Sequence, residues 1–273
     1  MTYFEAVVLG IVEGLTEFLP VSSTGHLTIA EKALGLQVND PSVTAFTAVI
    51  QIGAIAAVLV YFWRDITRIA AAWAKGIVKP ELRGELDHRM GWYIIVGSMP
   101  IGIVGFAAQD LITGPLRSLW VVAAALIGWS AVMLYAESRG RRTRGESEMT
   151  MRDALLMGLV QCVALVPGVS RSGATISAGL LLDLDRVAAT RMAFFLGIPS
   201  LTAAGLYELK HVGGVGIGPT IVGTLVSFVV AYASVAWLLR FVSHHSIGAF
   251  VPYRVALGLI LVVLLGSGVM TPT

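Results

Sequence analysis

The sequence predicts an all-α polytopic membrane protein, with six transmembrane helices and two re-entrant helix hairpins arranged as an inverted-topology repeat. The first observation behind this prediction is composition: of 273 residues, 56% are hydrophobic and only 13% are charged, against about 25% charged residues in a soluble domain. The other two are a pair of broken apolar stretches and an internal repeat. The apolar runs have helical length, whereas a membrane β-barrel shows alternating strands of about ten residues.

Six segments are long and apolar enough to cross a bilayer as helices. They are residues 43–63, 91–109, 119–136, 188–208, 219–240 and 250–268. Two further apolar stretches, 2–35 and 154–185, are interrupted by Pro20 and Pro167 with glycine and serine nearby. We interpret both as re-entrant helix pairs, which need protein or a watery cavity around their backbone. Two more full spans are the alternative interpretation.

An internal repeat relates the two broken stretches, and the offset from Gly10 to Gly158 is 148 residues. At the same offset, Val12, Val21, Ser22, Gly25, Ala30 and Leu34 recur as Val160, Val169, Ser170, Gly173, Ala178 and Leu182. We expect a single membrane domain over 1–273, with one copy at about 1–136 and the other at about 154–268. Each copy holds a hairpin and three spans. Because three is odd, the copies are oppositely oriented, and the hairpin tips should meet near the midplane.

Basic residues predict the orientation in the membrane. The loops 64–90 and 137–153 carry six and five of the 19 Lys and Arg residues, whereas the loops 110–118 and 209–218 carry one each. The first two should therefore be cytoplasmic, and the other two, like both termini, should lie outside. The net charge of +2 is small, and we expect no nucleic-acid binding.

The first hairpin tip, within residues 13–26, combines carboxylates, hydroxyls and an imidazole in an apolar setting. Glu13 and Glu17 lie four residues apart and share one face of a helix. Two carboxylates on one face suit Mg²⁺ or Ca²⁺, which prefer oxygen ligands. Pro20 should end this helix. A second helix would then follow, and Ser22, Ser23 and Thr24 are the candidates for its N-cap. The free N–H groups at the start of that helix favour an anion.

The second tip, residues 167–175, places Arg171 inside a long apolar stretch. A guanidinium is costly there and usually marks a functional site, and its planar fork suits phosphate oxygens. Hydroxyls at 170, 172 and 175 add donors, and the glycines at 168 and 173 allow close approach of a ligand. The alternative is a structural ion pair between Arg171 and Glu13 or Glu17. The two interpretations are compatible if substrate displaces part of the pair.

These two motifs resemble the signature motifs of the BacA/UppP undecaprenyl-diphosphate phosphatases. The likeness runs essentially end to end and includes Gln51-Ile52-Gly53 and Phe62-Trp63-Arg64. It implies an inverted-repeat fold with re-entrant helices and a C55 polyprenyl diphosphate substrate. It also implies hydrolysis to the monophosphate and inorganic phosphate, which recycles the carrier lipid for peptidoglycan and so supports cell-wall biogenesis and cell shape. The family is associated with bacitracin resistance, because bacitracin sequesters the same lipid.

The resemblance implies a multi-pass hydrolase of the bacterial plasma (inner) membrane, with an active site that opens to the outer (periplasmic) side. We expect Ser23 to attack phosphorus, activated by His26 one helical turn away; attack by His26 itself, or by water with Glu17 as base, is the alternative. Glu13 and Glu17 would hold a divalent cation, Mg²⁺ or Ca²⁺. The expected phosphate-binding residues are Ser22, Thr24, Gly25, Ser170, Arg171, Ser172, Gly173 and Thr175, with Arg171 also catalytic.

A transporter or flippase of an anionic polyprenyl lipid is the alternative function. Inverted repeats and half-helix tips are typical of transporters, whereas the cluster of serine, histidine and glutamate favours hydrolysis. Partners on either interpretation are the polyprenyl lipid and the bilayer, with bacitracin acting indirectly through the shared lipid. The oligomeric state stays open, a homo-oligomer included.

The predicted topology is tested by cysteine labelling. Cys162 is the only cysteine, so a Cys162→Ala chain provides a clean background. Single cysteines introduced at Ser138 and Ser118 should react with a membrane-impermeant reagent from opposite sides of the membrane. Labelling of both positions from the same side would contradict an inverted repeat.

Overall fold

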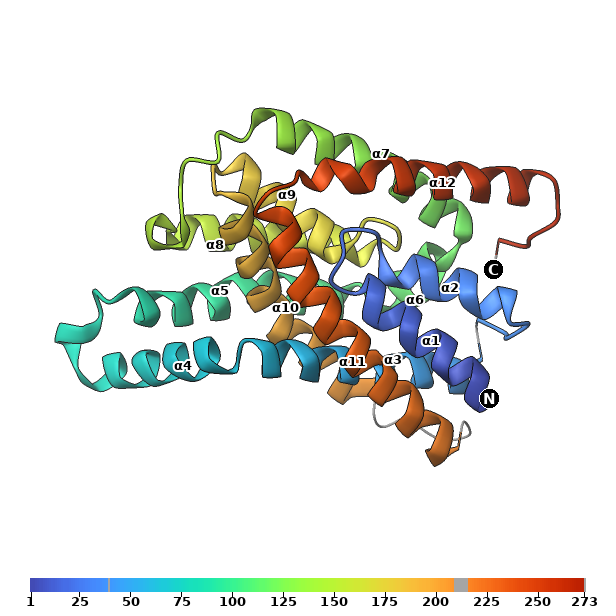
Figure 1. Ribbon diagram of the computed structural model, residues 1–273, viewed down its shortest axis with the longest axis horizontal. Helices are drawn as coiled ribbons and strands as arrows, with labels where there is room; N and C mark the ends of the chain where they lie inside the picture. Colours follow the sequence, from blue (N-terminus) through green and yellow to red (C-terminus); the bar gives the residue numbers. More distant parts are fainter. Residues whose placement is uncertain (39, 209–215, 273) are drawn as a thin grey trace.

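The computed structural model describes residues 1–38, 40–208 and 216–272, and these are almost entirely helical, with no β-strand among them (Figure 1). Six helices are long and apolar enough to cross a membrane. They are α3 (Pro41–Tyr61), α5 (Leu86–Ala107), α7 (Leu119–Arg139), α10 (Arg186–Glu208), α11 (Ile217–Val242) and α12 (Val251–Gly266), the last preceded by a 3-10 turn over Ile247–Phe250. The six predicted spans are confirmed, and the chain is a multi-pass helical membrane protein.

The two broken stretches form pairs of short helices. The first pair is α1 (Tyr3–Thr16) and α2 (Ser23–Ala33), which lie beside the two chain ends in Figure 1. The second is α8 (Met151–Gln161), extended by a 3-10 turn over Cys162–Leu165, and α9 (Arg171–Leu181). These helices have 14, 11, 11 and 11 residues, well short of the roughly 20 that a span needs. Short paired helices of this kind are what re-entrant hairpins require; their placement in a bilayer stays a prediction.

Positions related by the 148-residue offset adopt the same local structure. Helix α1 begins with a capping box between Thr2 and Glu5, and α8 begins with one between Thr150 and Asp153. In a capping box, each side chain accepts a hydrogen bond from the other residue's backbone N–H. The chain therefore starts both hairpins in the same way, as a repeat predicts.

The turns inside the hairpins match as well. Ser22 and Ser170 both adopt left-handed backbone conformations, with φ of 78° and 77°. Their hydroxyls cap α2 and α9 by accepting from the backbone N–H groups of Gly25 and Gly173. A non-glycine residue with positive φ is strained and persists only where its surroundings demand it. Both hairpins therefore store the same strain at their tips.

Each hairpin packs its first helix closely against a span from the other predicted copy. Helix α1 crosses α11 where Gly10 lies against the carbonyl of Gly223, and α8 crosses α5 where Gly158 lies against the carbonyl of Gly97. A Cβ at either Gly10 or Gly158 would overlap that backbone. Small residues at crossings let membrane helices approach closely and gain van der Waals contact. The two predicted copies are therefore interlocked.

The two hairpin tips meet, as the repeat predicts. The backbone N–H of Gly168 donates to Ser22 Oγ at 3.0 Å, and Ser172 Oγ donates to the carbonyl of Leu19 at 2.9 Å. Arg254 of α12 is fully buried and joins both tips. Its guanidinium donates to the carbonyls of Pro20 at 2.9 Å and Gly168 at 3.0 Å. Further bonds reach Val169 O at 3.1 Å and Ser130 Oγ at 3.2 Å.

Two predicted features are corrected. Residues 64–90 are not a plain loop, because α4 (Trp63–Val78) and a 3-10 turn over Pro80–Leu82 occupy most of them before α5 begins. Apolar residues recur at helical spacing along α4, so it forms an amphipathic helix that packs on α5. Helix α1 ends at Thr16 rather than at Pro20, because the carbonyls of residues 19 and 20 accept bonds from the second tip and from α12. The loop 209–218, predicted to lie outside, falls largely outside the described residues.

The α5–α8 crossing predicts that Gly158→Val destabilises the protein. Its side chain would overlap backbone rather than a flexible side chain, and overpacking typically costs about 1–3 kcal/mol. We expect a lower unfolding temperature in detergent. Gly128→Val is the matched control, because a Cβ at Gly128 of α7 meets nothing within 4 Å. Equal unfolding temperatures for the two variants would contradict the close crossing.

The Arg254 bonds predict that Arg254→Met destabilises the joined tips. The substitution keeps an elongated side chain but removes the donors for three buried carbonyls, and each buried group left unpaired costs about 1–3 kcal/mol. Arg254→Lys should rescue only in part, since an ammonium lacks the planar fork. Arg240→Met, on an exposed part of α11, controls for loss of charge. If Arg254→Met unfolded at the wild-type temperature, the hydrogen bonds of Arg254 would contribute nothing to stability.

Candidate functional site

A cavity of about 540 Å³ lies where the two tips meet. Its polar wall combines residues of both hairpins with glutamine and serine side chains from three spans or their ends: Glu17, Ser22, Ser23, Thr24, Ser170, Arg171, Gln51, Gln109 and Ser200. The first turns of α2 and α9 contribute Ser23, Thr24 and Arg171 to this wall. Six of the predicted site residues therefore share one cavity, although they come from segments about 150 residues apart in sequence.

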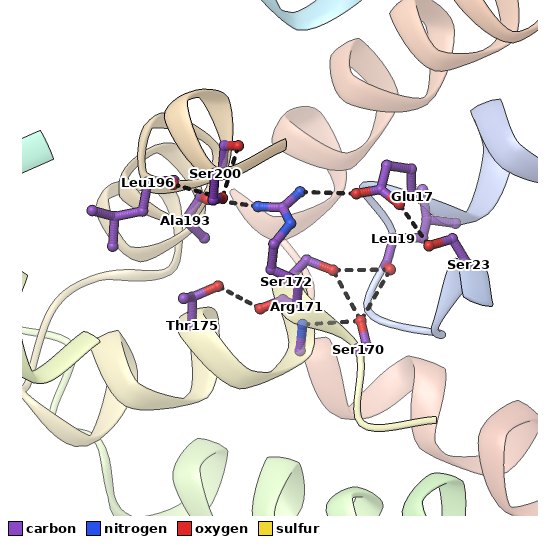
Figure 2. A network of polar contacts seen from close by, with 12 residues as sticks. Glu17, Leu19, Ser23, Ser170, Arg171, Ser172, Thr175, Ala193, Leu196 and Ser200 are labelled. Atoms are coloured by element: carbon purple, nitrogen blue, oxygen red, sulfur yellow. Dashed lines mark hydrogen bonds and ion pairs between the residues drawn. The ribbon is translucent and has the colours of Figure 1, made fainter. Parts of the chain in front are cut away.

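Arg171 lies at the centre of the polar network (Figure 2). One terminal nitrogen bonds Glu17 at 3.3 Å, and the other donates to the backbone carbonyl of Ala193 at 3.1 Å. The side chain is only 10% exposed, and its Nε has no hydrogen-bond partner among the described residues. The alternative interpretation of Arg171, an ion pair with a tip glutamate, is therefore present with Glu17. Because Arg171 also lines the cavity, the same guanidinium is placed to receive an anion.

Gly197 on α10 provides the space for this guanidinium. A Cβ at Gly197 would overlap the terminal nitrogen of Arg171 that bonds Ala193. The sequence analysis did not identify Gly197. A glycine inside an apolar span is a weak signal, because close helix crossings use glycine as well.

Ser23 is paired with Glu17 in this structure. Its hydroxyl donates to Glu17 Oε2 at 2.5 Å, while Glu17 Oε1 receives Arg171 (Figure 2). A serine hydroxyl bonded to a carboxylate is the arrangement of a nucleophile with its base. Glu17 thus joins the first tip to the second through its two oxygens.

His26 does not bond Ser23, although the two lie one turn apart on α2. Its Nδ1 lies 2.7 Å from the carbonyl of Ser22, and its Nε2 lies 2.6 Å from the hydroxyl of Tyr253 on α12. A carbonyl only accepts, so Nδ1 carries the proton and Nε2 accepts from the tyrosine. His26 is also absent from the cavity lining. Both ring nitrogens therefore have partners other than Ser23 in this structure, and the expected activation of Ser23 by His26 stays a prediction.

Four predicted phosphate-binding residues lie behind the cavity wall. Ser172 and Thr175 are fully buried, and their hydroxyls donate to the carbonyls of Leu19 and Arg171. The backbone N–H groups of Gly25 and Gly173 are taken by the serine caps. Helix capping and contact between the tips occupy these polar groups in this structure, and the phosphate-binding roles expected for the four residues stay predictions. Ser22, Thr24, Ser170 and Arg171 remain on the wall.

Glu13 is the other carboxylate of the first tip. It is 1% exposed, and neither of its oxygens has a hydrogen-bond partner among the described residues. The backbone N–H of Glu17 donates to Glu13 O at 2.9 Å, so the two residues lie one helical turn apart. No group of three or more His, Cys, Asp or Glu side chains in the described chain could hold a metal on its own. An unpartnered carboxylate one helical turn from Glu17 fits an oxygen-seeking cation, although Glu13 is not among the residues that line the cavity.

Two residues of α12 that contact the site were not identified by the sequence analysis. Arg254 holds both tips, and Tyr253 bonds His26. The signal for Arg254 was present, because an arginine within a predicted span marks a functional position by default. Tyr253 gave no such signal, since aromatic residues are common near the ends of membrane helices.

The arrangement is suited to an anion that carries an apolar group. Arg171 and the N-termini of α2 and α9 favour negative charge, and the Ser23–Glu17 pair lies on the same wall. The rest of the lining is mostly apolar and comes from α5, α10 and the turn before α9. The cavity lining therefore combines a set of polar and charged residues with a set of apolar ones.

Comparison with known proteins agrees with this geometry. The family model described as "Bacitracin resistance protein BacA" matches residues 6–260. The chain is 60% identical over 269 residues to "Undecaprenyl-diphosphatase 1" of Streptomyces coelicolor, covering 97% of each chain. It is 58% identical over 270 residues to the protein of the same name from Streptomyces avermitilis, covering 98% of each. It is 54% identical to "Undecaprenyl-diphosphatase 3" of Frankia casuarinae, covering the whole of both chains. This chain belongs to the BacA family.

Proposed function

We propose that this chain is an integral membrane phosphatase that hydrolyses undecaprenyl diphosphate to undecaprenyl phosphate and inorganic phosphate. This reaction recycles the carrier lipid for peptidoglycan synthesis. The observation that carries the proposal is the single cavity in which Arg171 and the Ser23–Glu17 pair share a polar wall beside an apolar chamber. The names of the relatives, at more than half identity over nearly full length, agree with that chemistry.

Binding of the diphosphate begins at Arg171. In the resting structure one of its nitrogens bonds Glu17, and an arriving phosphate competes with that carboxylate. The guanidinium then holds two phosphate oxygens at once, which an ammonium cannot do. Ser22, Thr24 and Ser170 line the same wall, and the helix N-termini add favourable dipoles. These groups hold the charge that spreads over the equatorial oxygens during phosphoryl transfer.

Ser23 is the proposed nucleophile, with Glu17 as its base. Glu17 takes the hydroxyl proton, Ser23 Oγ forms a bond to the terminal phosphorus, and the bond to the bridging oxygen breaks. The lipid monophosphate leaves with the bonding electron pair, and water then hydrolyses the phosphoserine to release inorganic phosphate. Attack by water with Glu17 as base is the alternative that uses the same carboxylate. In both routes His26 positions the turn, since its Nδ1–H holds the carbonyl of Ser22.

Glu13 and Glu17 are the residues that would hold a divalent cation, Mg²⁺ or Ca²⁺. The support is the unpartnered Glu13 carboxylate one turn from Glu17. When bound, such a cation supplies positive charge that neutralises phosphate oxygens.

We place the enzyme in the bacterial plasma (inner) membrane, with its cavity opening on the outer, periplasmic side. The cavity reaches Gln109 and Ile112, next to the loop 110–118 that carries a single basic residue. The positive-inside rule assigns such a loop to the outer side. An enzyme of this kind acts on the lipid that bacitracin binds, so its relation to bacitracin is indirect.

The proposal is tested by phosphate release from undecaprenyl diphosphate by the purified protein. Arg171→Lys should lower turnover about 10²–10³-fold, as expected when a transition-state contact is lost. Excess EDTA should abolish turnover, and Glu17→Gln should weaken both the rate and its dependence on metal. Arg240→Lys, on an exposed part of α11, is the matched control and should keep full activity.

Three outcomes would count against the proposal or one of its parts. Wild-type protein that moves the lipid across vesicles without releasing phosphate would favour a flippase. Full turnover in excess EDTA would reject the role of a cation in the reaction. Wild-type turnover of well-folded Arg171→Lys would reject the binding of phosphate oxygens by the Arg171 guanidinium.

A further inference from the structure

The apolar chamber of the cavity lies between two helices. One wall is the second half of α5, with Ile101, Gly102, Gly105 and Phe106, and the facing wall is the second half of α10, which includes Ala203. The floor is formed by the turn before α9, at Ala164, Leu165 and Pro167. The chamber is continuous with the polar wall that carries Arg171 and Ser23, because all these residues line one cavity.

Each chamber wall begins just beyond a proline inside its helix. Pro100 precedes the α5 wall and Pro199 precedes the α10 wall. An interior proline removes one hydrogen bond of the helix ladder and bends the helix. Before these prolines the two helices are in contact, because Ser98 Oγ of α5 donates to the carbonyl of Leu196 of α10 at 3.2 Å, and the α5 and α10 residues of the cavity lining follow the prolines.

The α5 wall is open because two of its residues have no side chain. A Cβ at Gly102 would meet nothing within 4 Å, and one at Gly105 would meet only Leu165 at 3.7 Å. These glycines therefore differ from those at the helix crossings, where a Cβ would overlap backbone. A larger side chain at Gly102 or Gly105 therefore fits in the folded protein without overlap, but it occupies part of the chamber.

Under the proposed function, the head of a lipid diphosphate binds at the polar wall of the same cavity. Arg171 Nε is buried and has no hydrogen-bond partner among the described residues, although the side chain lines the cavity. A lipid whose phosphates bind this guanidinium has to place its first carbons in the adjoining chamber. Phe106, which is 82% exposed, lies on the same α5 wall.

We infer that Gly102 and Gly105 determine specificity for the chain of the lipid, by leaving the α5 wall wide enough for the first methyl-branched isoprene units. This inference rests on the proposed function. The chain passes between α5 and α10 into the bilayer, with Ala203 on the facing wall. A branched prenyl chain is wider than a straight alkyl chain, so it needs the space that two missing side chains provide.

The experiment measures steady-state hydrolysis of undecaprenyl diphosphate by Gly102→Leu, Gly105→Leu and Ala203→Leu, together with inhibition by inorganic diphosphate, which has the head group and no chain. Each variant should raise KM for the lipid about tenfold or more, since hydrophobic pockets discriminate about 10–200-fold per misfitted methylene. The inhibition constant of inorganic diphosphate should stay at the wild-type value. Gly102→Ala should have a smaller effect than Gly102→Leu. Gly128→Leu is the matched control, because Gly128 of α7 is equally open but lies outside the cavity.

The outcomes separate the inference from the proposed function. A wild-type KM in all three leucine variants would overturn the inference and leave the phosphatase intact. Weaker inhibition by inorganic diphosphate in step with the rise in KM would also overturn it, because the head-group end would then be disturbed. No phosphate release by the wild-type protein would instead reject the proposed function itself. If a leucine variant does not fold, the graded alanine variant and the facing-wall variant carry the same test.

Discussion

The structure depends on one buried guanidinium. Arg254 is fully buried in a membrane helix, where an arginine is costly unless its donors are satisfied. Its partners are backbone carbonyls of both hairpin tips and a serine of α7. Those carbonyls are free to accept because the chain leaves helical geometry there. The carbonyls of the broken helices thus accept the hydrogen bonds that the buried guanidinium needs to donate. The cavity lies beside these hydrogen bonds, where the two tips meet.

The two predicted copies have diverged at the position that decides the chemistry. Ser23 of the first tip corresponds at the 148-residue offset to Arg171 of the second. Both follow a serine cap with the same strained conformation, and both bond the same residue, Glu17. Equivalent backbone positions therefore present a hydroxyl and a guanidinium to one carboxylate. Under the proposed function, the two roles that hydrolysis needs, attack and charge stabilisation, come from one repeated turn.

Composition and the repeat offset were sufficient to predict the six spans, both pairs of short helices and the meeting of their tips, because long apolar runs and a constant offset are properties of the sequence itself. The exceptions all depend on which way a side chain points. Helix α4 was missed because an amphipathic, basic helix resembles a charged loop. Ser172 and Thr175 were assigned to phosphate although their hydroxyls bond backbone. The partner of His26 could not be predicted, since Tyr253 lies 227 residues away in sequence.

The glycine crossings also constrain how the protein is made. Helix α1 packs on α11, which begins only at Ile217. During synthesis the first hairpin therefore lacks α11, its main packing partner, until most of the chain has been inserted. Non-local partners of this kind slow folding, because distant segments have to meet before they gain contact energy. The first half alone would expose Gly10 and Gly14 without α11 beside them, so the proposed site, which also needs Arg171 of the second half, is completed late in biogenesis and cannot form in a chain truncated before α11.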